Sequence, residues 1–160
     1  MDQGRVRILT TDDGLPDNFV RSIHQDSQNR MWFLAGRRTH PIVLFEDQNF
    51  SVLADCDEPL GINPRFNYTG GFSFFETEEG AIWFMDQKGV GQFKDGNFRF
   101  FTGIEAGDFS PSKAYQDPTG KIWLASPDGI LFFDGQKFQS DQALMPIRQA
   151  MSICGMGENI

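Results

Sequence analysis

The side chains best suited to bind a polar ligand lie in two irregular stretches of the sequence. The first, GRRTHP, contains Arg37, Arg38 and His40, and two guanidinium groups beside an imidazole could hold a carboxylate or sugar hydroxyls. The second stretch, 55–71, contains Arg65 and Tyr68, which add a cation and an aromatic face. Both stretches are predicted loops, and loops on a rigid scaffold often carry function. We expect these five residues to contact a ligand; the alternatives are solvated loops, a cap or a contact with a neighbouring domain.

Acid–base chemistry has few candidates in this chain. The imidazole bases are limited to His24 and His40. His24 takes the strand position that Phe75 and Tyr115 take in the repeats described below, which indicates a packed side chain and not a general base. We therefore expect no catalytic residue.

Metal ligands are equally sparse. Cys56 and Cys154 lie in different parts of the repeat pattern, and two thiols alone cannot form a four-ligand zinc site. Cys154 is predicted to be a small buried residue on a strand and Cys56 to lie in a polar loop, and a bridge between them stays open. The acidic pairs 12–13 and 78–79 are predicted turn residues in contact with solvent. The sequence thus predicts no metal site and no cofactor.

An internal repeat shows which elements must position these loops. Trp32, Trp83 and Trp123 end the phrases HQDSQNRMWF, FETEEGAIWF and YQDPTGKIWL, each with Asn or Gly three residues before the Trp. An F-x-x-x-x-F pattern follows in every unit: FEDQNF, FKDGNF and FDGQKF. The Trp residues are 51 and 40 positions apart, a spacing typical of supersecondary units that stack to share a core.

Each unit is predicted to be one blade of a propeller. Short runs of β-branched and aromatic residues alternate with turn signals every eight to twelve residues, as in four antiparallel strands. Asp26 and Asp117 can bond backbone N–H groups in the first turn of their units, and Thr77 is a weaker substitute in the second. We expect almost no helix and three equivalent Trp side chains, largely buried between blades.

The ends of the chain align with single strands. GRVRILT resembles GNFRFFT, the last strand of the second unit, and AMSICGMGENI resembles the first strand and turn of a unit. The predicted fold class is therefore all-β: a β-propeller fragment of about three four-stranded antiparallel blades plus a partial blade at each end, covering 1–160. The predicted parts are 1–11, the last strand of a preceding blade; 18–54, 72–102 and 111–141, the blades; and 150–160, the start of a following blade. We expect remaining propeller blades or a second copy of the chain to cover the open ends.

Charge and hydropathy exclude some partners. The net charge is −8, the isoelectric point is about 4.6, and Lys and Arg are scattered along the chain. Phosphate recognition needs clustered cations, so we expect no nucleic-acid partner and no binding to an anionic membrane surface. No apolar run approaches the length of a membrane span and the first residues lack the apolar core of a signal peptide, so we expect no direct membrane insertion in this segment.

The motif set resembles the two-component regulator propeller repeat. TTDDGLPDNFVRSIHQDSQNRMWFLA has D-G-L-P-x-N leading into a strand, then Q-D-x-x-[GN]-x-x-W and a small residue, and PSKAYQDPTGKIWLASPDGILFFDGQKF fits the same repeat. The spacing D-x-x-G-x-x-W is one residue longer than the sialidase Asp box and two shorter than the pyrroloquinoline-quinone propeller motif. Neither of those enzyme families is therefore favoured.

This resemblance implies a sensor module. Proteins of this family typically carry propellers outside the cytoplasmic membrane, followed by a membrane span and a histidine kinase or another output domain. In gut Bacteroidetes many are similar to regulators of polysaccharide use. The resemblance thus implies a periplasmic, non-catalytic segment that receives a signal from an oligosaccharide or another small ligand. Two other functions remain open: a structural or protein-interaction propeller, and a polysaccharide-active enzyme.

Overall fold

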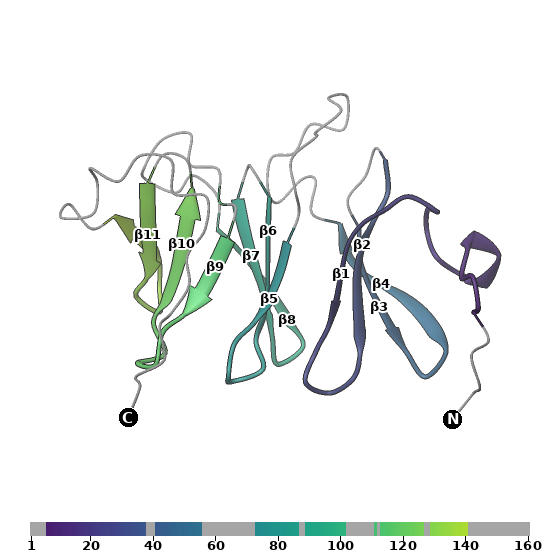
Figure 1. Ribbon diagram of the computed structural model, residues 1–160, viewed down its shortest axis with the longest axis horizontal. Helices are drawn as coiled ribbons and strands as arrows, with labels where there is room; N and C mark the ends of the chain where they lie inside the picture. The colour runs from purple at the N-terminus through teal and green to yellow at the C-terminus, as the bar shows by residue number, and fades with distance from the viewer. Residues whose placement is uncertain are drawn as a thin grey trace.

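The computed structural model describes residues 6–37, 41–55, 73–86, 89–101, 111, 113–126 and 129–140. They form three separate four-stranded antiparallel sheets (Figure 1). We call the sheets blades 1, 2 and 3. Blade 1 contains β1 (Val20–Gln25), β2 (Met31–Ala35), β3 (Pro41–Glu46) and β4 (Asn49–Asp55). Blade 2 contains β5 (Ser73–Glu76), β6 (Ile82–Asp86), β7 (Gly89–Lys94) and β8 (Asn97–Phe101), and blade 3 contains β9 (Lys113–Gln116), β10 (Ile122–Ser126), β11 (Gly129–Phe133) and β12 (Phe138–Ser140). The predicted all-β blade architecture is confirmed.

Local turn chemistry explains the hairpins. Asn29, Gly80 and Gly120 close the first hairpin of each blade with φ of 63°, 75° and 84°, the left-handed conformation that Gly and Asn tolerate best. The third and fourth strands of blades 1 and 2 are joined by two-residue turns, 47–48 and 95–96, whose residues all have positive φ. Such turns match the natural twist of paired strands. The blade pattern is therefore encoded largely by short-range sequence.

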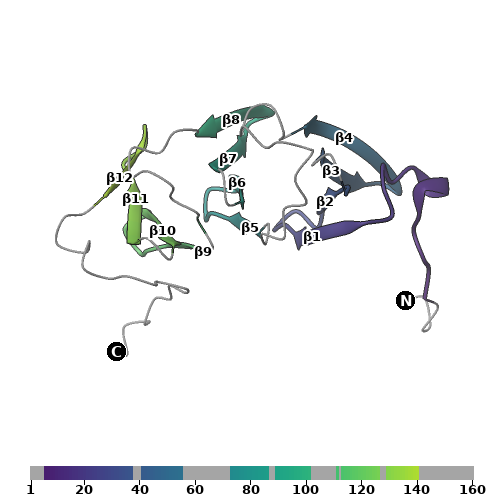
Figure 2. The same ribbon diagram turned by 90° about the horizontal axis from the view of Figure 1, so that it is seen from above.

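The blades stand side by side in an arc (Figure 2). Their first strands lie on the concave side, where β1 contacts β5 and β5 contacts β9, while β4, β8 and β12 lie on the convex side. Within each blade the strands follow chain order, so every hairpin joins neighbours in the sheet. As a result, the first hairpins of all three blades lie at one rim of the arc, and the second strands end and the third strands begin at the other (Figure 1).

The hydrophobic core lies between the blades. Trp32, Leu34 and Ile42 of blade 1 pack with Ile82 and Phe84 of blade 2 in one buried cluster. A second cluster joins the opposite face of blade 2 to blade 3, and it includes Trp83, Met85, Val90, Leu124 and Leu131. Since every second residue of a strand faces the same side, the central strands of blade 2 supply side chains to both neighbouring blades.

The tryptophans act as wedges between blades. The Trp32 ring lies 5.2 Å from that of Phe93 in blade 2, and the Trp83 ring lies 5.1 Å from that of Phe133 in blade 3. Trp32 and Trp83 are 0% and 1% exposed, as the repeat predicted. Trp123 holds the equivalent strand position but is partly exposed, because no blade packs against its face in the described part of the chain.

The predicted partial blades are described only in part. Residues 6–10 form no strand, and Thr11–Asp13 is a single 3-10 turn capped by the Thr10 side chain. Leu15 then packs on Ala35 and Val43, on the face of blade 1 that points away from blade 2. The predicted strand at 150–160 and both cysteines lie outside the described residues.

Candidate functional site

The first hairpin of blade 1 is organised around a buried carboxylate. Asp26 Oδ1 accepts from the backbone N–H groups of Gln28 (3.0 Å) and Arg30 (2.8 Å). Its Oδ2 accepts from the indole N–H of Trp32 (2.8 Å) and from Arg30 Nε (2.7 Å). Burial alone would raise the pKa of Asp26, but the bonds from Trp32 and Arg30 together hold that pKa below its usual value. One oxygen thus fixes the turn and the other fixes the Trp wedge.

The first hairpin of blade 3 repeats this arrangement. Asp117 Oδ1 accepts from the hydroxyl and backbone N–H of Thr119, at 2.6 and 2.9 Å, and from the backbone N–H of Lys121 at 3.1 Å. Asp117 Oδ2 accepts from the indole N–H of Trp123 at 2.8 Å. The bonds from Thr119 and Trp123 lower the pKa of Asp117 to about 2. The carboxylate stays ionised and holds the indole in place.

Blade 2 departs from this arrangement. Thr77 stands where the other two blades have Asp, and its hydroxyl accepts from the backbone N–H of Ala81 at 3.1 Å. The turn therefore keeps a backbone contact of the kind the sequence predicted. Among the described residues, however, the buried indole N–H of Trp83 meets no hydrogen-bond acceptor. An unsatisfied buried donor is rare and calls for a physical explanation.

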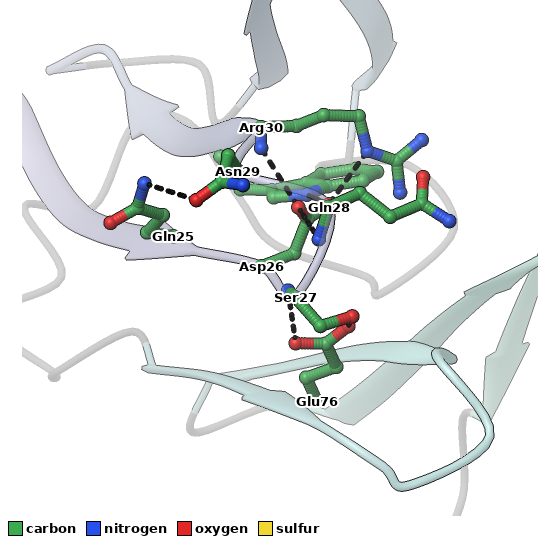
Figure 3. A network of polar contacts seen from close by, with 8 residues as sticks. Gln25, Asp26, Ser27, Gln28, Asn29, Arg30 and Glu76 are labelled. Carbon is green, nitrogen blue, oxygen red and sulfur yellow. Dashed lines mark hydrogen bonds and ion pairs between the residues drawn. The ribbon is translucent and has the colours of Figure 1, made fainter.

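Polar bonds also link the hairpin of one blade to the first strand of the next. Glu76, at the end of β5, accepts from the backbone N–H of Ser27 at 2.8 Å and from its hydroxyl at 2.7 Å (Figure 3). Gln116, at the same position in β9, accepts from the backbone N–H of Glu78 at 2.8 Å. The residue just before the Asp or Thr position therefore fixes the spacing between neighbouring blades.

A cleft of about 620 Å³ opens between blades 2 and 3, on the rim that carries these hairpins. We call it the blade 2–3 cleft. Its blade 2 side includes Thr77 and Ala81, which differ from the residues at the same positions in blades 1 and 3, and Trp83, whose indole N–H lacks the Asp acceptor found there. The cations on its walls are Lys94, Arg99 and Lys121. This cleft was not predicted from the sequence. Its signal was the pair Thr77 and Ala81, two small residues at positions that hold Asp and a cation in the other units.

Two of these cations rest on aromatic rings. Lys121 Nζ lies 3.5 Å from the centre of the Phe132 ring, and the Arg99 guanidinium carbon lies 4.6 Å from the centre of the Phe101 ring. Such cation–π contacts hold a charged side chain in place without neutralising it. Lys94 differs, because it pairs with Glu79 at 2.7 Å.

A second polar cluster lies at the opposite rim, beside blade 1. The guanidinium carbons of Arg21 and Arg37 lie 5.3 and 5.4 Å from the centre of the Phe19 ring. Arg21 Nε also donates to the carbonyl of Gly36 at 2.9 Å, which ties the start of β1 to the end of β2. Phe19 remains 41% exposed, so part of its ring is open to a ligand beside the exposed Arg37.

Of the five predicted ligand residues, the structure describes Arg37. It is exposed and lies in the Phe19 cluster, as a candidate ligand contact should. The other four, Arg38, His40, Arg65 and Tyr68, lie outside the described residues. Phe19 and Arg21 were missed, since their approach to Arg37 depends on the pairing of β1 with β2.

His24 behaves as a packed residue. It pairs with Trp32 across the sheet, as Phe75 pairs with Trp83, and its ring stacks on Phe74 of blade 2 at 6.2 Å. Within the described ranges no group of three or more His, Cys, Asp or Glu side chains is arranged to hold a metal ion.

Comparisons with known proteins agree with this geometry. The family model for the two component regulator propeller matches residues 14–37, which run from the Gly-Leu-Pro turn through β1 and β2. The resemblance stated from the sequence is thereby confirmed. A search of curated proteins found no match.

Solved structures show the same fold. The extracellular domain of a putative hybrid two component system from B. thetaiotaomicron is 20% identical, with a TM-score of 0.65 over 91% of this chain and 20% of that chain. The extracellular domain of a putative one component system from the same organism is 12% identical, with a TM-score of 0.62 over 85% of this chain and 18% of that chain. YCF48, solved with a D1 peptide, has a TM-score of 0.52 at 12% identity over 81% of this chain and 42% of that chain.

The chain spans about a fifth of the length of the two B. thetaiotaomicron domains. Like them it is built from propeller blades, and in the described ranges no helix is long and apolar enough to cross a membrane. Residues 14–37 thus resemble a two component regulator propeller repeat, and the fold is that of a segment built from propeller blades.

Proposed function

We propose that this chain is a ligand-sensing propeller segment of a periplasmic, two-component-type sensor, and that it is a non-catalytic, carbohydrate-responsive signal input. The observation that carries the proposal is the match of residues 14–37 to the two component regulator propeller. The extracellular placement of the two B. thetaiotaomicron domains supports it. A histidine kinase or another output domain would belong to the parent protein.

The described part of the ligand surface in this proposal is the Phe19 cluster. The exposed part of the Phe19 ring suits the apolar face of a sugar ring, and the exposed Arg37 supplies donors for its hydroxyls. Arg21 donates to the carbonyls of Gly36 and Arg37 and so positions this cluster. The same proposal includes four further ligand contacts that the sequence predicts: Arg38, His40, Arg65 and Tyr68.

A thermal-shift screen of the chain against neutral and acidic oligosaccharides tests this proposal. A binding sugar should raise the melting temperature in a concentration-dependent way. Phe19→Ala and Arg37→Ala should abolish the shift, while Lys137→Ala, an exposed change at the opposite rim, should keep it. Glycosidase and lyase assays on the same sugars should show no turnover; turnover would favour a polysaccharide-active enzyme instead. A screen without any shift would contradict ligand sensing by this segment.

A structural or protein-interaction role is the second candidate function. On the face of blade 1 that points away from blade 2, Ile23 and Val52 are 58% and 57% exposed. The equivalent face of blade 2 is covered by blade 1, and that of blade 3 is covered by blade 2. The open face of blade 1 therefore suits a further blade or a second copy of the chain.

Sedimentation at micromolar concentration tests that role. Self-association that Ile23→Glu abolishes, and that the polar-surface change Lys137→Gln does not affect, would support a docking function for this face. A stable, cooperative monomer would contradict pairing through this face.

A further inference from the structure

The missing acceptor of Trp83 is specific to blade 2. In blades 1 and 3 an Asp Oδ2 lies 2.8 Å from the indole N–H of the equivalent Trp. In blade 2 the side chain at that position is Thr77, whose hydroxyl oxygen already bonds the backbone of Ala81. The repeat geometry therefore directs the N–H of Trp83 towards Thr77, and no protein acceptor meets it there among the described residues.

The cation that accompanies this Asp is also replaced in blade 2. Arg30 and Lys121 follow the turn in blades 1 and 3 and lie 5.4 and 4.4 Å from the centres of their Trp rings. Blade 2 has Ala81 in their place, so this turn has shorter side chains at both the Asp position and the cation position. Thr77, Ala81 and Trp83 all line the blade 2–3 cleft, so the cleft opens where the carboxylate is missing.

The opposite wall supplies positive charge to the same cleft. Lys121 of blade 3 rests on Phe132, and no carboxylate in the described part of the chain forms an ion pair with it. Arg99 reaches across from β8 and donates to the carbonyl of Gln136. The two carboxylates on the cleft walls are already engaged, because Glu79 pairs with Lys94 and Asp134 accepts from the backbone N–H groups of Gln136 and Lys137. Lys121, Arg99 and the indole N–H of Trp83 therefore lie beside the position that the Asp carboxylate holds in the other two blades.

We propose that the blade 2–3 cleft binds the carboxylate group of a small acidic ligand, which takes the place that Asp26 and Asp117 occupy in the neighbouring blades. One carboxylate oxygen accepts from Trp83 Nε1, and Lys121 and Arg99 balance the charge. The indole N–H is covered in the free structure, so the turn around Ala81 moves outward when the ligand enters. This site lies at the opposite rim from the Phe19 cluster, and its test is independent of the proposed sensing function.

The indole N–H groups themselves provide the measurement. The chain has three Trp residues, so a proton–nitrogen correlation spectrum contains three indole signals, and Trp83→Phe identifies the one from Trp83. The probes are sodium acetate and sodium glucuronate at constant ionic strength, with sodium chloride and glucose as controls. A hydrogen bond to a carboxylate should shift the Trp83 signal saturably and leave those of Trp32 and Trp123 in place. A response to glucuronate but not acetate would identify a uronic acid as the source of the carboxylate; equal responses would identify a simple carboxylate.

Two variants separate binding from general effects. Thr77→Asp supplies the repeat's own carboxylate, so the Trp83 signal should already be shifted in the free protein and no longer respond to the probes. Lys121→Gln should weaken binding about tenfold or more, as expected for the loss of a charge-assisted contact. The matched control Lys113→Gln changes an exposed lysine outside the cleft and should leave the affinity unchanged. A Trp83 signal that does not respond to either carboxylate, or that responds equally in the Lys121→Gln variant, overturns the proposal.

Discussion

Replacing Asp26 should test the role of the buried carboxylate most directly. Its four bonds divide by oxygen: Oδ1 accepts from two backbone N–H groups, and Oδ2 accepts from Trp32 and Arg30. Asp26→Ala removes all four and leaves the Trp32 N–H unsatisfied in the core. Arg30 is 20% exposed and can turn towards water, which moderates the loss. We expect the free energy of unfolding to fall by about 3 to 4 kcal/mol.

Asp26→Asn separates the two halves of this network. The amide oxygen can keep the backbone bonds of the turn, but its NH₂ group would face the donors of Trp32 and Arg30. We expect a loss of about 2 to 3 kcal/mol, smaller than for Ala. Thr77→Ala is the matched control from blade 2, where the hydroxyl accepts one backbone bond and the expected loss is about 1 kcal/mol.

Urea denaturation followed by far-ultraviolet circular dichroism measures these differences. An unchanged m-value would show that each variant unfolds through the same transition. The expected order of stability is wild type, Thr77→Ala, Asp26→Asn and then Asp26→Ala. If Asp26→Ala is no less stable than Thr77→Ala, the carboxylate does not organise blade 1 and the reasoning fails.

Three further predictions follow from the same geometry. The pKa of Asp117 in the folded protein is lowered to about 2, so its contribution to folding stability is present above its unfolded pKa of about 3.9 and is lost as the pH falls towards 2. Across this range the melting temperature should depend less steeply on pH in Asp117→Asn than in the wild type, and an identical dependence would contradict the assigned bonds. In a double-mutant cycle, Glu76→Ala and Ser27→Ala should show a coupling of about 0.5 to 1 kcal/mol from the bond between the Ser27 hydroxyl and Glu76, because Ser27→Ala keeps the backbone bond; strict additivity would mean that the hydroxyl bond does not help to join the blades. Gly91→Ala would place a methyl group within the ring of Phe84 and should lower stability by about 1 to 3 kcal/mol in chemical denaturation, and an unchanged midpoint would show that the ring moves freely.

Much of the fold could be predicted because its determinants are local. The first hairpin of each blade depends on residues a few positions apart, namely the positive φ of Asn29, Gly80 or Gly120 and, in blades 1 and 3, the Asp bonds within the turn. Each repeat therefore encodes its own hairpin. The alternation of side chains along a strand then placed Trp32 and Trp83 against the next blade. Spacing in the sequence was therefore enough to predict the blades and their wedges.

The candidate sites could be predicted only in part. Arg37 was expected at a ligand surface from its residue type and loop, but Phe19 and Arg21 join it through the pairing of β1 with β2. The aromatic face of that cluster therefore had no short-range signal. The blade 2–3 cleft depends even more on packing, because Trp83 and Lys121 come from different blades.

The amino-acid sequence alone shows that Thr77 and Ala81 break the repeat at the middle turn. Its consequence depends on how the blades pack, since Phe133 of blade 3 packs on the Trp83 ring and the buried indole N–H meets no acceptor in the described part of the chain. An exposed indole would bond to water, and the substitution would have no consequence. The physical reason for the difference is that hydrogen-bond satisfaction depends on solvent access, which only the stacking of neighbouring blades sets.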